Sequence, residues 1–343
     1  MKAVVLRAAG DIAVEEIADP CIVEPGDAIV AVRATAICGA DLFPFHGLTP
    51  GFEPGTVLGH EFAGEVVEVG SGVERVRAGQ RVVNASMISD GTCRSCRAGR
   101  VTQCERRSLF GYSGVYPRLD GGQAELVRVP RADRALRALP DDVSDEAAVF
   151  LADILPTGFG AVERGGVSAG DTVVVVGCGP VGLMAVLCAV GVAVRVIALD
   201  GVPTRRELAA RLGAVAAAPE EAAAVVADAT DGLGADVVIE AAGSAGALDA
   251  SLKLVRGRGV VSVVGAHFEP DYPLDNRVMF ERELTMRFSI GDPTADGELL
   301  LSRLADGELD PTVTITHRLP LSEAVEAYRL FDSREATKVV LSP

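Results

Sequence analysis

Residues 172–182 read Thr-Val-Val-Val-Val-Gly-Cys-Gly-Pro-Val-Gly. The first five residues form a continuous β-branched run, which is typical of a strand buried on both faces of a parallel sheet. Gly177, Gly179 and Gly182 follow this run and precede an apolar helix. In that context glycines allow a tight turn, close approach of the backbone to a diphosphate, and close packing of helix on strand. The stretch therefore predicts a strand, a turn and a helix that bind a dinucleotide.

Neighbouring residues complete the predicted nucleotide site. Pro180 and Val181 lie in the turn, where the start of the helix supplies amide donors and a positive dipole end. Asp200 ends the next predicted strand, and its carboxylate can accept both ribose hydroxyls and would repel a 2′-phosphate. NAD is therefore favoured over NADP. Arg205 could meet a 2′-phosphate or lie solvated on the next helix, so NADP stays the lesser alternative.

The chain on either side of this turn shows two patterns. Before about residue 145, short alternating runs such as 28–35 and 62–69 predict a mostly antiparallel β domain. A helical stretch is expected over 145–164. From residue 172 onward, strands alternate with helices, which predicts a parallel, doubly wound sheet. We therefore expect an α/β fold with a β domain over 1–152, a thiol-rich lobe at 85–110 within it, a nucleotide-binding domain over 153–290, and a C-terminal segment over 291–343 that returns to the β domain.

Composition argues against two kinds of partner. The chain has 343 residues, with 48 acidic and 32 basic side chains and a formal net charge of -16. Nucleic-acid binding needs clustered Lys and Arg, so we expect no nucleic-acid partner. No run approaches the roughly 18 apolar residues of a membrane span and no signal-peptide pattern opens the chain, so we expect no membrane partner. The seven cysteines indicate metal ligands and free thiols in the reducing cytoplasm.

Three short motifs carry a resemblance to a known family. They are Cys38-Gly39-Ala40-Asp41, Gly59-His60-Glu61, and residues 151–158, which read Leu-Ala-Asp-Ile-Leu-Pro-Thr-Gly. The chain resembles the medium-chain zinc-dependent alcohol dehydrogenases over nearly its whole length. This resemblance implies a GroES-like fold for the β domain, a Rossmann fold for the nucleotide-binding domain, and a place for Thr157 beside the cofactor.

The resemblance also implies a catalytic zinc beside the nicotinamide, bound by Cys38, His60 and Asp153. Glu61 would lie behind these ligands or exchange into the coordination sphere. A thiolate, an imidazole and a carboxylate leave a fourth position open for an alcohol, whose pKa the zinc would lower while hydride leaves for the nicotinamide. Taken alone, each residue has another explanation: core packing for Cys38 and His60, and helix capping for Asp153.

A second cluster consists of Asp90, Cys93, Cys96 and Cys104. In the family this lobe normally carries four cysteines around a structural zinc, and here Asp90 replaces the first. A carboxylate can bind zinc, but oxygen in place of sulfur should weaken the affinity. Two interpretations stay open: a structural zinc held by one aspartate and three thiolates, or a lobe with three free thiols.

The usual proton relay is missing from this chain. The family commonly has Ser or Thr two residues after the zinc-binding cysteine, and often His five residues after it, to pass the alcohol proton to solvent. The chain has Ala40 and Phe43 at these positions. His46 could substitute as the proton carrier, or water could carry the proton directly.

Aromatic residues gather around the first cysteine and just after the thiol-rich lobe. They are Phe43, Phe45, Phe52, Phe110 and Tyr112. An apolar substrate pocket would explain them, and so would ordinary core packing of the β domain.

These features predict a zinc-dependent oxidoreductase that transfers a hydride between NAD and an alcohol, a secondary alcohol or polyol, or reduces the corresponding carbonyl. The motif around Asp153 also resembles formaldehyde dehydrogenases and dismutases, although those members tend to be longer. A non-catalytic NAD-binding protein is the more distant alternative. The resemblance further implies a homodimer or homotetramer.

Overall fold

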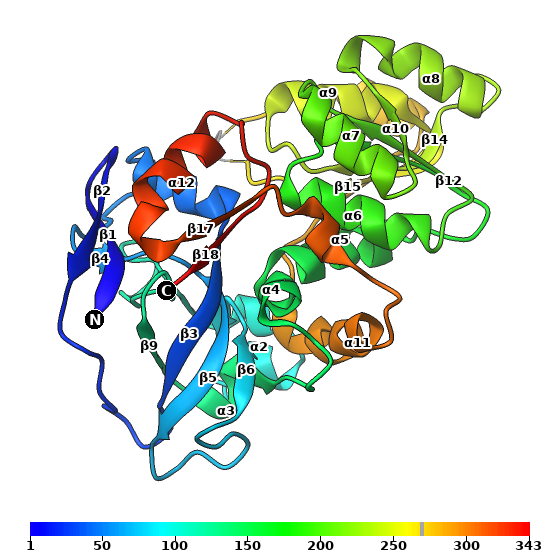
Figure 1. The fold of residues 1–343 in the computed structure, drawn as a ribbon. Helices are drawn as coiled ribbons and strands as arrows, with labels where there is room; N and C mark the ends of the chain where they lie inside the picture. The colour runs from blue at the N-terminus through cyan, green and yellow to red at the C-terminus, as the bar shows by residue number, and fades with distance from the viewer. Residues whose placement is uncertain (268–270) are drawn as a thin grey trace. The chain divides into compact units, whose positions relative to one another are not determined.

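The computed structural model of the protein describes residues 1–267 and 271–343. The chain divides into two compact units. The first contains Met1–Pro156 and Asp292–Pro343, and the second contains Thr157–Gly291 (Figure 1). The first unit is built mainly on antiparallel strands, and the second on a parallel sheet.

The first unit is organised around one long strand, β3 (Ala28–Ile37). Most residues of β3 are buried, and the strand has partners along both edges. It pairs antiparallel with β5 (Glu61–Val69) on one side and with β18 (Val339–Ser342) on the other. The strand order of this sheet is β10-β6-β5-β3-β18-β17, and β9 also pairs with β3. The other strands of the unit are β1 (Lys2–Ala8), β2 (Asp11–Glu16), β4 (Thr56–Val57), β6 (Arg81–Asn84), β7 (Met87–Ile88), β8 (Ser108–Leu109), β9 (Leu126–Val129), β10 (Leu136–Ala138) and β17 (His317–Pro320).

The strand register brings three loops to the same end of this sheet. Ile37 pairs with Val339, and Ala36 pairs with Glu61. Because both pairings are antiparallel, β3 ends where β5 and β18 begin. The residues after β3, before β5 and before β18 therefore share one end of the sheet.

Short helices connect these strands. The helices of the first unit are α1 (Leu42–Phe45), α2 (Arg94–Arg97), α3 (Ala132–Ala135), α4 (Asp145–Ala148), α11 (Pro293–Ala305) and α12 (Ala324–Asp332). Its 3-10 helices are η1 (Gly39–Asp41), η2 (Val101–Gln103), η3 (Val149–Ala152), η5 (Pro311–Thr314) and η6 (Leu321–Glu323).

The second unit contains a parallel sheet with the order β13-β12-β11-β14-β15-β16. Strand β11 (Thr172–Val176) lies inside this sheet and is buried along its whole length, as its β-branched run predicts. The other strands are β12 (Arg195–Leu199), β13 (Val215–Ala217), β14 (Ala235–Glu240), β15 (Val255–Val263) and β16 (Thr285–Phe288). The helices are α6 (Pro180–Val190), α7 (Pro203–Arg211), α8 (Ala222–Ala229), α9 (Ala245–Leu254) and α10 (Asn276–Glu281), with the 3-10 helix η4 (Pro219–Glu221).

The helical stretch expected over 145–164 is present, but it is divided into three segments. The chain forms α4, then η3, and then α5 (Ile154–Gly165), with Asp153 at the interruption at φ −152° and ψ −68°. Pro156 explains the break, because proline has no N–H for the carbonyl of Ala152 and its ring clashes with that carbonyl in a continuous helix. Asp153 therefore lies between two helical segments instead of within one.

Each unit has its own buried apolar core. In the first unit Phe62 and Phe110 are fully buried, and in the second Val174 and Ile197 are fully buried. No helix in the described part of the chain is long and apolar enough to cross a membrane.

Candidate functional site

Three side chains meet at the end of the sheet where β3 ends and β5 begins. Cys38 directly follows β3, His60 directly precedes β5, and Asp153 lies between η3 and α5. The Sγ atom of Cys38 lies 3.7 Å from Oδ2 of Asp153, and Nε2 of His60 lies 3.2 Å from the same oxygen. A carboxylate oxygen of Glu61 joins them, and the four ligand atoms all lie within 4.8 Å of one another. The structure thus brings together the four residues named as candidates for the catalytic metal.

The donor set of this cluster fits a zinc ion. Sulfur, nitrogen and oxygen donors are the ligands that zinc takes in tetrahedral catalytic sites. Burial, together with the nearby carboxylate of Glu61, raises the pKa of the Cys38 thiol to about 11. A thiolate at this position therefore needs a cation beside it, and a metal ion would supply that charge.

Asp41 holds two of these ligands in place. Its Oδ1 lies 3.2 Å from Nδ1 of His60, and its Oδ2 accepts a hydrogen bond of 2.9 Å from the backbone N–H of Cys38. Burial alone would lower the pKa of His60, but its neighbours Asp41 and Cys38 raise the pKa well above its usual range. A carboxylate beside Nδ1 favours the tautomer that leaves Nε2 for a metal. Sequence reasoning quoted Asp41 in the Cys38 motif but missed this role.

A fully buried lysine lies behind the cluster. Lys338 precedes β18, and its Nζ donates a hydrogen bond to Oε2 of Glu61 and a second one, of 3.3 Å, to the carbonyl oxygen of Ile37. Burial raises the pKa of Glu61, and Lys338 opposes that rise. Within the described residues, Oε1 of Glu61 has no hydrogen-bond partner. Nothing in the sequence around Lys338 signals this role, because the pairing of β18 with β3 creates it.

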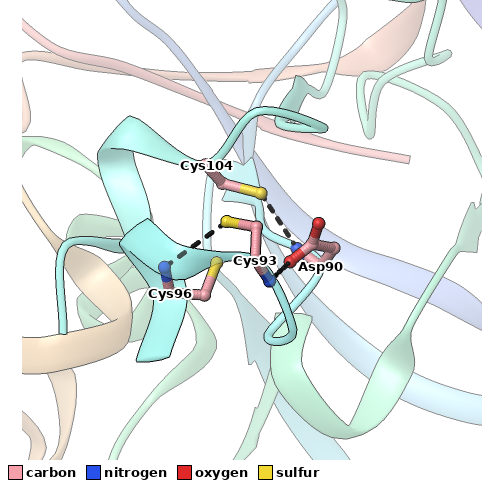
Figure 2. Close-up of side chains that lie close together, drawn as sticks. All are labelled: Asp90, Cys93, Cys96 and Cys104. Carbon is pink, nitrogen blue, oxygen red and sulfur yellow. Dashed lines mark hydrogen bonds between the residues drawn. The ribbon is translucent and has the colours of Figure 1, made fainter. Parts of the chain in front are cut away.

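The second cluster comes together in the thiol-rich lobe. Figure 2 shows Asp90, Cys93, Cys96 and Cys104 gathered in one place, and one ligand atom from each lies within 4.8 Å of the others. The backbone N–H of Asp90 donates to Sγ of Cys104 at 3.2 Å, and that of Cys96 donates to Sγ of Cys93 at 3.5 Å. Backbone donors of this kind stabilise thiolates. The lobe therefore has the ligand types and the spacing of a metal site.

Asp90 also shapes the loop that carries the thiols. Its Oδ1 accepts hydrogen bonds from the backbone N–H groups of Thr92 at 2.7 Å and Cys93 at 2.9 Å. These backbone donors lower the pKa of Asp90 well below its ordinary value. The carboxylate is therefore ionised at neutral pH, and its Oδ1 already accepts hydrogen bonds from the backbone of the turn.

In the glycine turn of the second unit, positions 177 and 182 cannot carry a side chain without strain. Gly177 follows β11 with φ at +92°, in the region that favours glycine. A Cβ atom on Gly182 would lie only 1.8 Å from the carbonyl oxygen of Gly177. Gly179 caps helix α6, which begins with Pro180 and Val181. The turn thus ends at a helix N-terminus, where backbone amides can meet a diphosphate.

Asp200 and Arg205 flank this turn. Asp200 directly follows β12, and its carboxylate accepts hydrogen bonds of 2.7 Å from the backbone N–H groups of Cys178 and Val202. The Nη1 atom of Arg205 lies 3.9 Å from the position that a Cβ atom would take on Gly179. The acidic and the basic candidate for ribose recognition are therefore both next to the glycine turn.

Two further candidates are not members of the clusters of ligand atoms. Thr157 lies on α5 in the second unit, where a Cβ atom on Gly291 would come within 2.2 Å of its Oγ1. His46 follows α1, and its Nε2 lies 2.8 Å from Oδ1 of Asp332 on α12. Its side chain is 44% exposed, and it is not among the clustered ligands.

Two of the aromatic residues, Phe110 and Tyr112, have different surroundings. Phe110 packs edge-to-face on Phe62 at 5.1 Å, and both are fully buried, so Phe110 belongs to the core. Tyr112 instead lies beside a metal-ligand candidate, with its ring centroid 6.5 Å from that of His60.

Comparison with known proteins identifies the family. Residues 24–141 match the family described as alcohol dehydrogenase GroES-like domain, and residues 180–306 match the family described as zinc-binding dehydrogenase. The chain is 37% identical to zinc-type alcohol dehydrogenase B from Aspergillus flavus, over 99% of this chain and 81% of that protein. The chain belongs to the zinc-dependent medium-chain alcohol dehydrogenases. This alcohol dehydrogenase is also 32% identical to a sorbitol dehydrogenase from Halalkalibacterium halodurans, over 97% of this chain and 96% of that protein.

The fold of this alcohol dehydrogenase matches solved relatives. The alcohol dehydrogenase TADH from Thermus sp. ATN1 superimposes with a TM-score of 0.95 at 40% identity, covering 100% of this chain and 99% of that one. The predicted GroES-like and Rossmann folds are confirmed. The predicted class, a zinc-dependent oxidoreductase of the alcohol dehydrogenase type that acts on a small molecule with a nicotinamide cofactor, is confirmed as well.

Proposed function

We propose that this alcohol dehydrogenase transfers a hydride between NAD and a secondary alcohol or polyol, and that the reaction is reversible. The observation that carries the proposal is the convergence of Cys38 Sγ, His60 Nε2 and Asp153 Oδ2 at one end of the sheet. The relatives support a polyol or secondary alcohol: one is named a sorbitol dehydrogenase, and a similar solved structure is 2R,3R-butanediol dehydrogenase from Bacillus subtilis.

Cys38, His60 and Asp153 would hold the catalytic zinc in this reaction. When bound, zinc supplies Lewis-acid activation of an alcohol oxygen, and the nicotinamide supplies the hydride acceptor. Asp41, beside Nδ1 of His60, keeps Nε2 available as the ligand atom. Glu61 adds a further carboxylate oxygen, and Lys338 balances its charge in the buried site.

The proposed reaction is tested by following NADH formation with a panel of secondary, polyol and primary alcohols and formaldehyde, with Cys38→Ser as the control. We expect turnover with a secondary alcohol or polyol that the control loses. Turnover with formaldehyde alone would instead support the formaldehyde dehydrogenase or dismutase alternative, which the motif around Asp153 favours. Protein that binds NAD and zinc but oxidises nothing would support a non-catalytic role.

We propose NAD as the cofactor, with NADP as the lesser alternative. Asp200 supports NAD, because its carboxylate lies at the glycine turn and would repel a 2′-phosphate. Similar solved structures are described with each cofactor: one from Escherichia coli with NADH and one from Sinorhizobium meliloti with NADP. The test is kcat/KM for NAD and for NADP in the wild type and in Asp200→Ser. We expect the wild type to prefer NAD and the variant to lose that preference; a wild type that prefers NADP would assign Arg205 to a 2′-phosphate.

We propose two zinc ions per chain, one catalytic and one structural. The two clusters of ligand atoms support this count. Elemental analysis should find about two zinc ions per chain in the wild type and one each in Cys38→Ser and Cys104→Ser. One zinc in the wild type that only Cys38→Ser removes would mean three free thiols in the lobe.

We propose a homodimer or homotetramer formed through the sheet of the second unit. Strand β16 is the last strand of that sheet in the described structure, and unpaired strand edges invite pairing with another chain. Phe288 on β16 is 65% exposed, Ile290 is 57% exposed and Phe280 on α10 is 84% exposed. Light scattering should give the mass of a dimer or tetramer, and Phe288→Lys should shift it toward the monomer. A monomeric wild type would contradict the proposal.

We propose a cytoplasmic location. All seven cysteines are free thiols in the structure, as a reducing compartment allows. Fractionation of cells that express the protein checks this, and recovery with an oxidising compartment would contradict it.

A further inference from the structure

A buried glutamine lies beside the loop that carries His60. Gln123 is 0% exposed, its backbone N–H donates to the carbonyl oxygen of Leu58 at 2.9 Å, and its carbonyl oxygen accepts from the N–H of Val4 at 2.8 Å. Gly59 directly precedes His60 and makes room for the glutamine, since a Cβ atom on Gly59 would lie 2.5 Å from Cγ of Gln123. The main chain thus holds the side chain of Gln123 next to a metal-ligand candidate.

The two ends of the Gln123 amide have different neighbours. Its Nε2 atom donates to two oxygen atoms, the carbonyl oxygen of Ala36 at 3.3 Å and Oδ2 of Asp41 at 3.4 Å. Its Oε1 atom accepts a hydrogen bond of 2.9 Å from the hydroxyl of Tyr328 on α12. The reverse orientation would place Oε1 against a carbonyl and a carboxylate, neither of which has a proton to donate. The surroundings therefore select one orientation of the amide.

The amide in turn fixes the carboxylate of Asp41. Oδ2 of Asp41 accepts from Nε2 of Gln123 and, at 2.9 Å, from the backbone N–H of Cys38. Oδ1 lies 3.2 Å from Nδ1 of His60, and among the described residues neither of these two atoms has another hydrogen-bond partner. Rotation of the carboxylate about its terminal bond would break the hydrogen bonds of Oδ2. The direction of Oδ1 toward His60 therefore depends on Gln123.

All members of this hydrogen-bond network are shielded from water. Tyr328, Gln123 and Asp41 are each 0% exposed, and His60 is 1% exposed. Burial raises the pKa of Tyr328, so its hydroxyl keeps the proton that Gln123 accepts. A buried polar group that loses its partner pays the full cost of its desolvation. The loss of one member therefore disturbs the orientation of the next.

We propose that Tyr328 and Gln123 are positioning residues for the metal ligand His60 and that they act through Asp41. The network joins the C-terminal helix α12 to the ring nitrogen of His60 that faces away from the ligand cluster. This inference rests on the proposed function, because it requires Cys38, His60 and Asp153 to hold a metal ion. Residues that orient a metal ligand from behind change metal affinity by about 10–100-fold when they are replaced.

The test measures how tightly the full-length enzyme holds cobalt(II), a coloured substitute for zinc, when the loaded protein is equilibrated with increasing chelator. The absorption that Cys38→Ser abolishes reports the cluster at Cys38. We expect Gln123→Met, which keeps the length of the side chain but removes the amide, to weaken this binding by about tenfold. Tyr328→Phe removes only the hydroxyl and should weaken it by about fivefold, the effect of one hydrogen bond.

Two further variants separate positioning from packing. Phe331 is 5% exposed and lies in the same apolar core as Tyr328, so Phe331→Leu should lower the thermal unfolding midpoint without changing cobalt affinity. Tyr328→Phe combined with Gln123→Met should bind cobalt as Gln123→Met alone does, because the network is already broken. Tyr328→Phe keeps the whole ring, so it gives an answer even where Gln123→Met fails to fold.

Unchanged cobalt affinity in Tyr328→Phe or in folded Gln123→Met would overturn the proposal. Losses that add in the double variant, or a loss in Phe331→Leu equal to that in Tyr328→Phe, would overturn it as well, because either result indicates packing.

The failure of the proposed function gives a different result. Cobalt absorption that Cys38→Ser leaves unchanged would contradict the catalytic metal site and would overturn this inference with it. Affinities that respond as expected, in an enzyme that oxidises no alcohol of the panel, would support the roles of Tyr328 and Gln123 and contradict only the proposed reaction.

Discussion

The Nζ atom of Lys338 donates a hydrogen bond to Oε2 of Glu61, and both side chains are 0% exposed. Glu61 is the neighbour of His60 in sequence, and Lys338 comes from the other end of the chain. A buried ion of either sign is costly unless it is paired and hydrogen-bonded. The pair therefore fixes the C-terminal strand β18 beside the candidate metal site.

Replacing Lys338 with methionine should destabilise the first unit. The variant leaves the Glu61 carboxylate buried without its partner, and breaking a buried pair in this way costs about 3–5 kcal/mol. Urea unfolding of the zinc-loaded enzyme measures the change. The matched control is Lys338→Met combined with Glu61→Gln, which removes both charges and should recover most of the loss. A double variant as unstable as Lys338→Met would show that the packing of Lys338, and not its charge, matters.

Substitutions at Asp90 should change how tightly the lobe holds zinc. Asp90→Cys supplies the softer sulfur ligand and should slow the release of zinc to a chromogenic chelator. Asp90→Ala removes a ligand and also the acceptor for Thr92 and Cys93, so it should speed the release. Equal release rates in the wild type and both variants would mean that Asp90 does not bind the metal.

Chelation should loosen the thiol-rich lobe before it affects the nucleotide-binding unit. The lobe contains only short elements such as α2 and η2, so a bound metal would be its main source of order. Hydrogen exchange with and without chelator should show lost protection at Cys93–Cys104 and little change along β11. Equal loss of protection in both places would contradict this prediction.

Asp236 should make the stability of the second unit depend on pH. Its carboxylate accepts hydrogen bonds from Nε of Arg256 at 2.7 Å and from the backbone N–H of Thr172 at 2.8 Å. Burial raises the pKa of Asp236, but these partners outweigh burial and lower the pKa below its ordinary value. Because the folded pKa is below the unfolded one, the stabilisation is present above roughly pH 4 and is lost as the pH falls through the folded pKa.

Asp236→Asn should therefore cost about 1 kcal/mol near neutral pH and less near pH 3. Urea unfolding of both proteins at the two pH values measures the difference. The same cost at both values would show that the charge of Asp236 is not what stabilises the unit.

The role of His46 as the proton carrier remains a prediction. If its ring passes the alcohol proton to solvent, His46→Ala should lower kcat and shift the pH dependence of kcat, because one titrating group leaves the pathway. Asp332→Asn is the matched variant, since it removes the carboxylate 2.8 Å from Nε2 but keeps the ring. A pH profile that His46→Ala leaves unchanged would remove His46 from the mechanism and leave water as the carrier.

Local residue types were enough to predict the nucleotide-binding turn. A β-branched run followed by glycines at 177, 179 and 182 is typical of this turn. The positive φ angle of Gly177 and the lack of space at Gly182 both exclude a side chain. The same holds for the thiol-rich lobe, whose ligands lie close together in sequence. Because the residues of such sites lie close together in the sequence, the sites can be predicted without knowledge of the fold.

Contacts that depend on distant pairing could not be read from local patterns. The meeting of Asp153 with Cys38 and His60 was expected from the family resemblance alone, and the interruption of the helical stretch at Asp153 appears only in the structure. Lys338 shows the same limit, because it contacts Glu61 only through the pairing of β18 with β3. Neither contact leaves a local pattern in the chain.

The sequence by itself determined the fold class, the family and the chemical types of the candidate metal ligands, because these depend on residue identity and on motif spacing. The tertiary structure alone decided which groups support the ligands: Asp41 beside His60, Lys338 beneath Glu61, and Tyr112 on the carbonyl of Ala40. The physical reason is that burial, charge pairing and hydrogen-bond direction arise only when segments far apart in the chain are packed against one another.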